Sequence, residues 1–183
     1  PQDPYANRDK RFYQTLLYHG SYWEGSQLLM HRHLQNPDWS GNCLPNDYRA
    51  RCGYGLRKMM QEYDGASADL YSGAFAQDNN WPYFRYAEVL LNYAEAVFER
   101  NADAEGNIMD ASKVDAALVY LNEVRQRVNP NMPGLTTSFA TTHNLKMREE
   151  IRRERTVELF NEGFRIDDLK RWKTAETEMP ENM

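Results

Sequence analysis

The hydrophobic positions of the chain follow a helical period only after residue 81. From Pro82, which suits a first helical position, apolar residues recur at intervals of three and four, as on a helix with one buried face. The stripe of this predicted helix consists of Ala87, Leu90, Leu91, Ala94, Val97 and Phe98. A second helix is predicted to begin at Asp110 or Ser112, because both are good N-caps. Its stripe consists of Val114, Ala117, Leu118, Leu121, Val124 and Val128.

The two predicted helices should form an antiparallel pair, because only the short polar turn NADAEGN connects them. Alanines at close-packing positions face larger residues, much as in tetratricopeptide units. One pair does not establish a repeat array, and no second copy stands at the ~34-residue period of such units. The predicted fold class is all-α, with tetratricopeptide-like helix pairs and a long irregular, loop-rich N-terminal segment.

A third helix is predicted to begin within residues 141–144 and to run to Gly163. Its apolar stripe is thin, because helical steps from Ile151 reach charged residues at 154, 155 and 158 before the next apolar side chain. Acidic residues also follow one another at intervals of four, and such pairs would repel on a solvated surface. The pattern therefore favours an internal network of paired charges.

The stretch EGFRIDDLKRW, residues 162–172, follows that helix. Gly163 can adopt the left-handed conformation that ends a helix, with Leu159 and Phe164 as the hydrophobic pair of a Schellman ending.

After this ending, Ile166, Leu169 and Trp172 are spaced for one apolar face of a further helix or turn, with Trp172 in the core. Acidic and basic residues of this region are close enough to neutralise one another. The predicted network consists of Glu158, Glu162, Arg165, Asp168 and Arg171. Removing the Arg165 side chain should cost ~3 kcal/mol if it is buried and paired.

The first 80 residues differ from the rest of the chain in composition and lack a helical period. Glycine, proline, asparagine and aspartate recur at short intervals, which indicates turns and loops, with one short strand pair around RFYQTLLYHG. Sixteen of the 23 aromatic residues lie within the first 86 positions, so the aromatic side chains are concentrated where the helical period is absent. The sequence therefore predicts a loop-rich segment at 1–80, a helical region at 81–175 and a tail at 176–183.

Composition narrows the range of functions. The net charge of −5 disfavours general nucleic-acid binding, and no run approaches the ~20 apolar residues that span a bilayer. Cys43 and Cys52 are the only cysteines, and composition leaves a disulfide and two free thiols equally open. With His31 and His33 they could be written as a zinc site, but the spacing of the cysteines does not fit one, so we expect no metal and no cofactor.

Three segments carry a resemblance to a known family. RYAEVLLNYAEAVFE, AALVYLNEVRQRV and IRRERTVELFNEGFRIDDLKRW, in that order, resemble the C-terminal portion of the SusD/RagB family of nutrient-binding outer-membrane lipoproteins. NRDKRFYQTLLYHG and GYGLRKMM look like the family's stretch before those helices. Family members are longer, with a signal peptide, a lipidated cysteine and an N-terminal helical half, so the chain looks like a C-terminal fragment with a shortened tail.

The resemblance implies a function at the bacterial cell surface. It implies a lipid anchor upstream of this chain, capture of glycans or, in some members, peptides, and partnership with a SusC-like TonB-dependent transporter. In that context a Cys43–Cys52 disulfide is favoured, and the loop-rich segment would face the ligand. Glycan sites combine aromatic faces with polar side chains that bind hydroxyls. The candidates of this kind are Tyr22, Trp23, Trp39, Asn46, Asp47 and Arg49.

Two other classes of function remain as alternatives. One is a tetratricopeptide-type module that binds a protein or peptide and has no glycan affinity. The other is a glycoside hydrolase built from two carboxylates, such as Asp167 and Asp168. The hydrolase is disfavoured because each C-terminal acid has a basic residue within helical reach and no catalytic motif is present.

Overall fold

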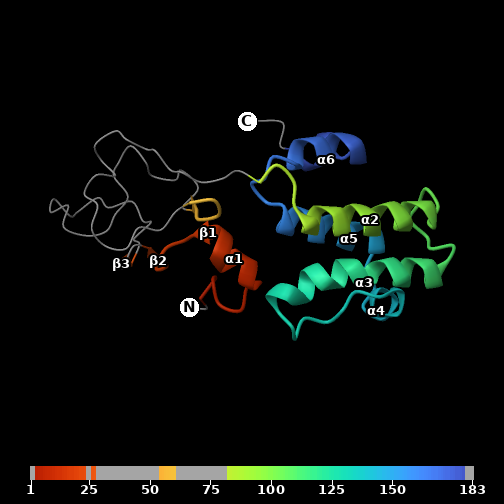
Figure 1. Ribbon diagram of the computed structural model, residues 1–183, viewed down its shortest axis with the longest axis horizontal. Helices are drawn as coiled ribbons and strands as arrows, with labels where there is room; N and C mark the ends of the chain where they lie inside the picture. Colours follow the sequence, from red (N-terminus) through yellow and green to blue (C-terminus); the bar gives the residue numbers. More distant parts are fainter. Residues whose placement is uncertain (1–2, 24–25, 28–53, 61–81, 180–183) are drawn as a thin grey trace. The chain divides into compact units, whose positions relative to one another are not determined.

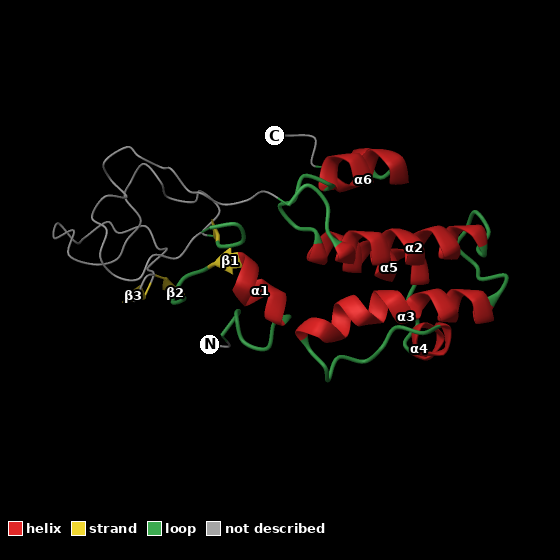
Figure 2. Cartoon of the chain, viewed as in Figure 1, coloured by secondary structure: helices red, strands yellow, loops and turns green. Residues whose placement is uncertain are grey.

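The computed structural model of the chain describes residues 3–23, 26–27, 54–60 and 82–179. The chain divides into two compact units, Pro1–Trp81 and Pro82–Met183. The described strands lie in the first unit, whereas the second is helical (Figure 2). Helices hold 54% of the described residues and strands 7%, which confirms the predicted all-α class.

The described part of the first unit consists of one short helix and two short strand pairs. Helix α1, Lys10–Thr15, is capped by Asp9, whose carboxylate accepts a hydrogen bond from the Arg11 amide at 2.9 Å. Strand β1, Leu16–Leu17, pairs antiparallel with β4, Gly55–Leu56, and β2, Tyr22–Trp23, pairs antiparallel with β3, Ser26–Gln27. The predicted strand pair is thus partly wrong, because a capped helix occupies its first half and the strand that follows pairs far along the chain.

Helices α2, Tyr86–Arg100, and α3, Ala111–Val128, form the centre of the second unit and run antiparallel, side by side (Figure 1). Their predicted stripes face each other, and all members are buried except Val97 and Val128, which are half-buried. Large core side chains such as Phe98, Leu118 and Leu121 are at most 1% exposed. Each such side chain contributes about 1.5–3 kcal/mol by leaving water, so this pair supplies the apolar core.

Both helix starts have an identifiable cause. Helix α3 follows Asp110, the first of the two predicted caps, which accepts a hydrogen bond from the Lys113 amide at 3.2 Å. Helix α2 begins at Tyr86 and not at Pro82, so the predicted start is four residues early. Arg85 remains extended, at φ −145° and ψ 158°, and its guanidinium is bound by side chains from near the end of the chain.

The segment after α3 folds back on that helix. The side chain of Asn122 accepts a hydrogen bond from the Leu135 amide at 2.6 Å and donates one to the Leu135 carbonyl at 2.8 Å. Asp115 accepts from both the amide and the hydroxyl of Thr137, at 2.7 and 2.8 Å. These bonds position the short helix α4, Thr137–Thr142, against α3.

The third predicted helix, 141–163, is wrong in extent. Asn144 adopts a left-handed conformation, φ 52°, which separates α4 from helix α5, Met147–Glu158. Leu159 is the residue that caps α5, so it is not part of a Schellman ending at Gly163. Gly163 has φ 90°, but it lies in the loop after the helix has ended.

The chain continues into helix α6, Arg165–Trp172, and the single turn α7, Ala175–Glu178, which begins at the last residue of the predicted helical region and extends into the predicted tail. Leu169 and Trp172 are buried, as their spacing predicted, whereas Ile166 is 57% exposed and does not belong to the buried face. Lys173, at φ 58°, ends α6.

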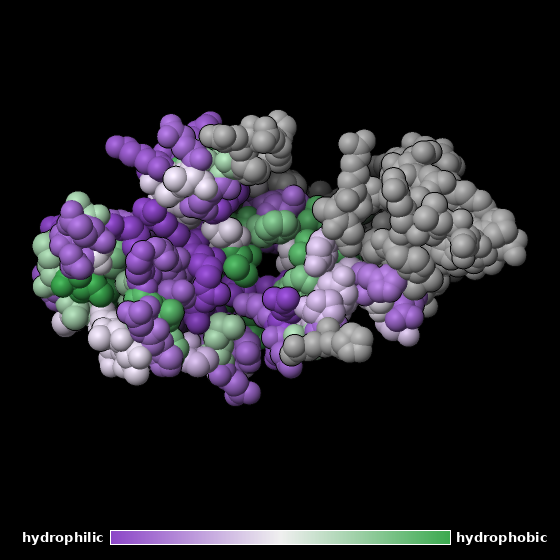
Figure 3. Space-filling view, turned by 180° about the vertical axis from the view of Figure 1, so that it is seen from behind, coloured by the Kyte–Doolittle hydropathy of each residue, from purple (hydrophilic) through white to green (hydrophobic). Residues whose placement is uncertain are grey.

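Helix α5 packs against α2 and α3 although its buried face is largely charged. Its buried residues are Met147, Ile151, Glu154, Arg155 and Glu158. On the side drawn in Figure 3, hydrophilic residues cover much of the described surface and smaller hydrophobic patches interrupt them. The second unit therefore has polar side chains both on its surface and in part of its interior.

Candidate functional site

Five aromatic rings meet in the described part of the first unit. Phe12 and Tyr13 come from α1, and Tyr5, Tyr18 and Tyr54 come from the segments around it. The Tyr5 and Tyr18 rings are 4.6 Å apart between centroids, and the Phe12 and Tyr18 rings are 5.3 Å apart. Tyr54 approaches Tyr5 and Phe12 edge-on at 6.2 and 6.3 Å. These separations are those of directly interacting rings, so the five residues form one aromatic cluster.

Polar contacts hold part of this cluster in place. The Tyr13 hydroxyl donates to the Tyr5 carbonyl at 2.6 Å and accepts from the Arg8 amide at 3.1 Å. Burial and the neighbouring Tyr54 raise the pKa of Tyr5 above its ordinary value. Tyr54 is 39% exposed and the other four rings are half-buried. The cluster is therefore ordered by its own contacts and still accessible to solvent.

Two of the six predicted ligand residues lie in the described part of the chain. Tyr22 is 68% exposed on β2, and Trp23 is half-buried with the guanidinium of Arg57 at 5.7 Å from its ring centroid. Successive side chains of a strand point to opposite faces, so these two rings do not present themselves to the same sugar ring.

Several predicted residues lie outside the described part of the chain. These are Trp39, Asn46, Asp47, Arg49, the two cysteines Cys43 and Cys52, and the two histidines of the discarded zinc site. Within residues 3–23, 26–27, 54–60 and 82–179, no cluster of histidine, cysteine, aspartate or glutamate could hold a metal ion. Among the same residues, no helix is long and apolar enough to cross a membrane.

In the second unit, the charged face of α5 pairs with its neighbours. Glu154 accepts a hydrogen bond from Arg125 of α3 at 3.0 Å, and both side chains are at most 7% exposed. Arg155 donates to Asp168 of α6 at 2.8 Å and to Asn92 of α2 at 2.6 Å. Helix α5 is thus joined to three other helices by charges that have left water.

A second group of charges fixes α6 on α2. Glu95 accepts a hydrogen bond from the Trp172 indole at 2.6 Å and two from Arg171, at 2.6 and 2.7 Å. Arg171 also donates to Asp168 at 2.8 Å. The hydrogen bond to Glu95 is the main cause that raises the pKa of Arg171, and burial only partly opposes it. The guanidinium groups of Arg152 and Arg171 each lie 4.9 Å from the centroid of the Trp172 ring, within reach of a cation–π contact.

A third group lies where α5 ends and α2 begins. Arg85 donates to Glu158 at 2.6 Å and to both oxygens of Glu162 at 2.7 Å, and Arg127 of α3 donates to Glu158 at 2.7 Å. Burial alone would raise the pKa of Glu158, but the hydrogen bonds from Arg85 and Arg127 outweigh it and hold the pKa below its ordinary value. Glu158 is therefore ionised at neutral pH and is not suited to act as a general acid.

The three groups include most of the predicted network. Glu158, Glu162, Asp168 and Arg171 take part, and Trp172 donates to the second group. Arg165 is separate, because it pairs with Glu178 of α7, and both side chains are at least 40% exposed. Four further partners come from other segments, and sequence spacing alone did not identify them: Arg85, Glu95, Arg125 and Arg127.

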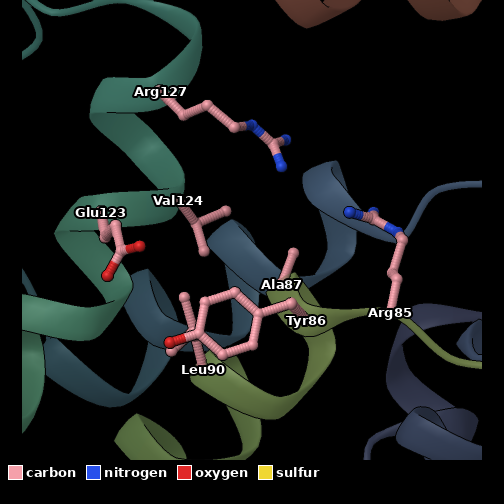
Figure 4. A pocket seen from close by; sticks show the side chains of 7 residues that line it. All are labelled: Arg85, Tyr86, Ala87, Leu90, Glu123, Val124 and Arg127. Carbon is pink, nitrogen blue, oxygen red and sulfur yellow. The ribbon is translucent and has the colours of Figure 1, made fainter.

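A pocket of about 220 Å³ lies between α2 and α3 beside the third group (Figure 4). Ala87, Leu90 and Val124 give it an apolar lining, and all three are buried. Its polar lining comes from Arg85, Tyr86, Glu123 and Arg127. Figure 4 shows the two guanidinium groups pointing toward one another across the pocket.

Sequence reasoning missed both the aromatic cluster and this pocket. The high density of aromatic residues before residue 86 was the available signal for the cluster. For the pocket, the signal was an aromatic residue, Tyr86, beside the buried stripe of α2 and outside it.

Comparison with known proteins assigns the chain to a family. A protein-family model described as the SusD family matches residues 1–183. No curated protein matches the chain, and no solved structure matches it. Because the family model covers the whole chain, the protein belongs to the SusD family.

Proposed function

We propose that this protein is a non-catalytic glycan-binding subunit of the bacterial cell surface that delivers oligosaccharide to a SusC-like TonB-dependent transporter. Membership of the SusD family supports nutrient or glycan binding in general. Proteins of this family are typically associated with the outer membrane at the cell surface. We propose three further points: that the ligand is a glycan, that the protein works with a SusC-like transporter, and that it does not catalyse a reaction.

The aromatic cluster of the first unit is the observation that carries the proposal. Sugar rings have an apolar face that packs on aromatic rings and hydroxyl groups that bind nearby polar side chains. The cluster presents five rings that are accessible to solvent, and Tyr22 adds a sixth that is 68% exposed. We propose that Tyr54 and Tyr22 contact the glycan, together with Trp23. Trp39, Asn46, Asp47 and Arg49 stay predictions.

Calorimetry of the intact protein against a panel of polysaccharides and peptides tests this function. We expect saturable heat with at least one polysaccharide, and about fivefold weaker binding for Tyr22→Ala or Tyr54→Ala, because each loses about 1 kcal/mol of ring contact. Tyr83→Ala is the matched control, since Tyr83 is 92% exposed on the second unit. Absence of binding heat with every member of the panel would contradict the glycan proposal.

The transporter partnership and the absence of catalysis have separate tests. Purification of the protein from outer membranes should recover a TonB-dependent transporter with it, and recovery of the protein alone would contradict the partnership. Incubation with a bound polysaccharide should release no reducing sugar. Release that depends on Asp167 or Asp168 would instead favour the glycoside hydrolase.

A further inference from the structure

We propose that the pocket between α2 and α3 is a second site for glycans, which holds one neutral sugar ring. Its volume of about 220 Å³ is below the roughly 300–1,000 Å³ of pockets for drug-sized ligands, so it suits a single ring and not a whole oligosaccharide. The proposal rests on the proposed glycan-binding function. It concerns residues of the second unit alone and does not involve the aromatic cluster.

The ring of Tyr86 supplies a surface for the apolar face of a sugar. Tyr86 is 66% exposed at the first position of α2, and within the described residues it makes no aromatic contact and no hydrogen bond through its hydroxyl. Its ring reaches from α2 toward α3 (Figure 4). The buried side chains of Ala87, Leu90 and Val124 supply further apolar surface in the same pocket.

The polar lining can bind hydroxyl groups in both directions. Arg127 donates one hydrogen bond to Glu158 at 2.7 Å, and among the described residues its other N–H groups have no partner. Glu123 is exposed one helical turn before Arg127, and the structure shows no ion pair between them. Glu123 therefore offers acceptors and Arg127 offers donors to the same small volume.

The hydrogen bond to Glu158 also restricts the position of the Arg127 side chain before a ligand binds. Its partner Glu158 is 3% exposed and is fixed from the other side by Arg85. A donor that is already immobilised loses less conformational freedom when a ligand binds, so its hydrogen bonds contribute more to affinity.

The charges of the pocket disfavour an anionic ligand. The cations Arg85 and Arg127 are compensated by the buried carboxylates of Glu158 and Glu162, so an anionic ligand finds no unpaired cation. Glu123 at the rim would repel an anion. A sugar without charged groups satisfies both the donors and the acceptors and meets no such repulsion.

Two further tyrosines extend the site along the same helices. Tyr93 lies seven residues after Tyr86 on the same face of α2, about 10.5 Å along the axis. Its ring meets that of Tyr120 from α3 edge-on at 5.2 Å, and the two residues are 51% and 41% exposed. An oligosaccharide with one ring in the pocket could therefore continue over these two tyrosines.

Fluorine NMR of the full chain labelled with 3-fluorotyrosine tests the site. The Tyr86 resonance is identified by its absence from the spectrum of Tyr86→Phe. The probes are maltohexaose, xylohexaose, mannohexaose and laminarihexaose as neutral sugars, with oligogalacturonate and a lysine tripeptide as charged probes. We expect at least one neutral hexaose to shift this resonance in a saturable way, and the charged probes to leave it unchanged.

Variants measured by calorimetry with the same hexaose separate the possible outcomes. Tyr86→Ala should weaken binding at the second site about tenfold, while the control Tyr83→Ala should bind like the unmodified protein. If hexaose binding depends on Tyr22 or Tyr54 and the Tyr86 resonance stays still, the second site is wrong and the proposed function stands. If no sugar binds anywhere, both are wrong. If only a charged probe moves the Tyr86 resonance, the neutral-sugar site is overturned.

Discussion

Replacement of Asp168 by asparagine should destabilise the protein strongly. Asp168 binds Arg155 at 2.8 Å, and both side chains are 5% exposed, so water cannot replace the lost charge. The neutral amide would leave the Arg155 guanidinium buried without its counter-ion and would weaken the bond from Arg171. Breaking one partner of such a buried pair costs about 3–5 kcal/mol.

Thermal and urea unfolding followed by circular dichroism measure this cost. For a chain of this size, 1 kcal/mol corresponds to about 2–4 °C, so Asp168→Asn should lower Tm by about 6–20 °C. The matched control is Asp167→Asn, because Asp167 is the neighbouring acid, is exposed, and has no ion pair among the described residues. The control should change stability by no more than about 0.5 kcal/mol.

A double variant distinguishes a buried charge from simple packing. Arg155→Met with Asp168→Leu removes both charges and leaves apolar side chains, so it should recover most of the stability that Asp168→Asn loses. If Asp168→Asn alone unfolds within about 1 °C of the unmodified protein, the pair is hydrated in solution and the reasoning from burial fails.

Three smaller effects should follow from the same unit. Glu158 has a pKa below its usual value of 4.5. The stability that its ionised form contributes is therefore present above pH 4.5 and is lost as the pH falls below it. In Glu158→Gln, the urea concentration at the midpoint of unfolding should depend less on pH below about pH 4.5. Gly163→Ala should cost about 1–2 kcal/mol through its left-handed backbone alone, since no atom lies within 4 Å of the added methyl. Arg165→Ala should cost at most about 1 kcal/mol by urea unfolding and leave glycan affinity unchanged, because its pair with Glu178 is exposed.

The helices with apolar faces could be predicted from the sequence. Leu91 and Leu118 stand at the centre of stripes with a helical period, and burial of one face is the physical cause of that period. The start of α2 could not be predicted in the same way. Arg85 stays extended because it binds Glu158 and Glu162, more than 70 residues away, and no local pattern records that contact.

Helix α5 shows why charged helices are harder to delimit. Its interior face contains Glu154 and Arg155, so the hydrophobic period along this segment is too weak to define where the helix begins and ends. The conflict between a helical segment and a charged face did indicate that the charges are internal. Their partners are on other helices, and only the folded chain brings Arg125 or Asp168 to them.

The candidate sites depended even more on the fold. Tyr54 meets Tyr5 across 49 positions of the chain, so aromatic density indicated a ligand-facing region without identifying the rings that touch. Tyr86 and Tyr93 could have been noticed, because both lie off the buried stripe of α2 and must face outward. Sequence alone could not add Glu123 and Arg127 from α3, which turn an exposed tyrosine into a lined pocket.

The buried charges connect the scaffold to the proposed second site. An apolar interior of the same volume is often at least as stable as a buried ion-pair network, so stability alone does not explain so many buried charges. A network does require one relative position of the helices, since Glu158 must reach Arg85 before α2 and Arg127 on α3 at once. Because that same Arg127 lines the pocket, Glu158→Gln releases a ligand-facing side chain as well as a structural contact. Loss of neutral-hexaose affinity in that variant, at a pH where it remains folded, would link the two roles, and unchanged affinity would show that the network serves the fold alone.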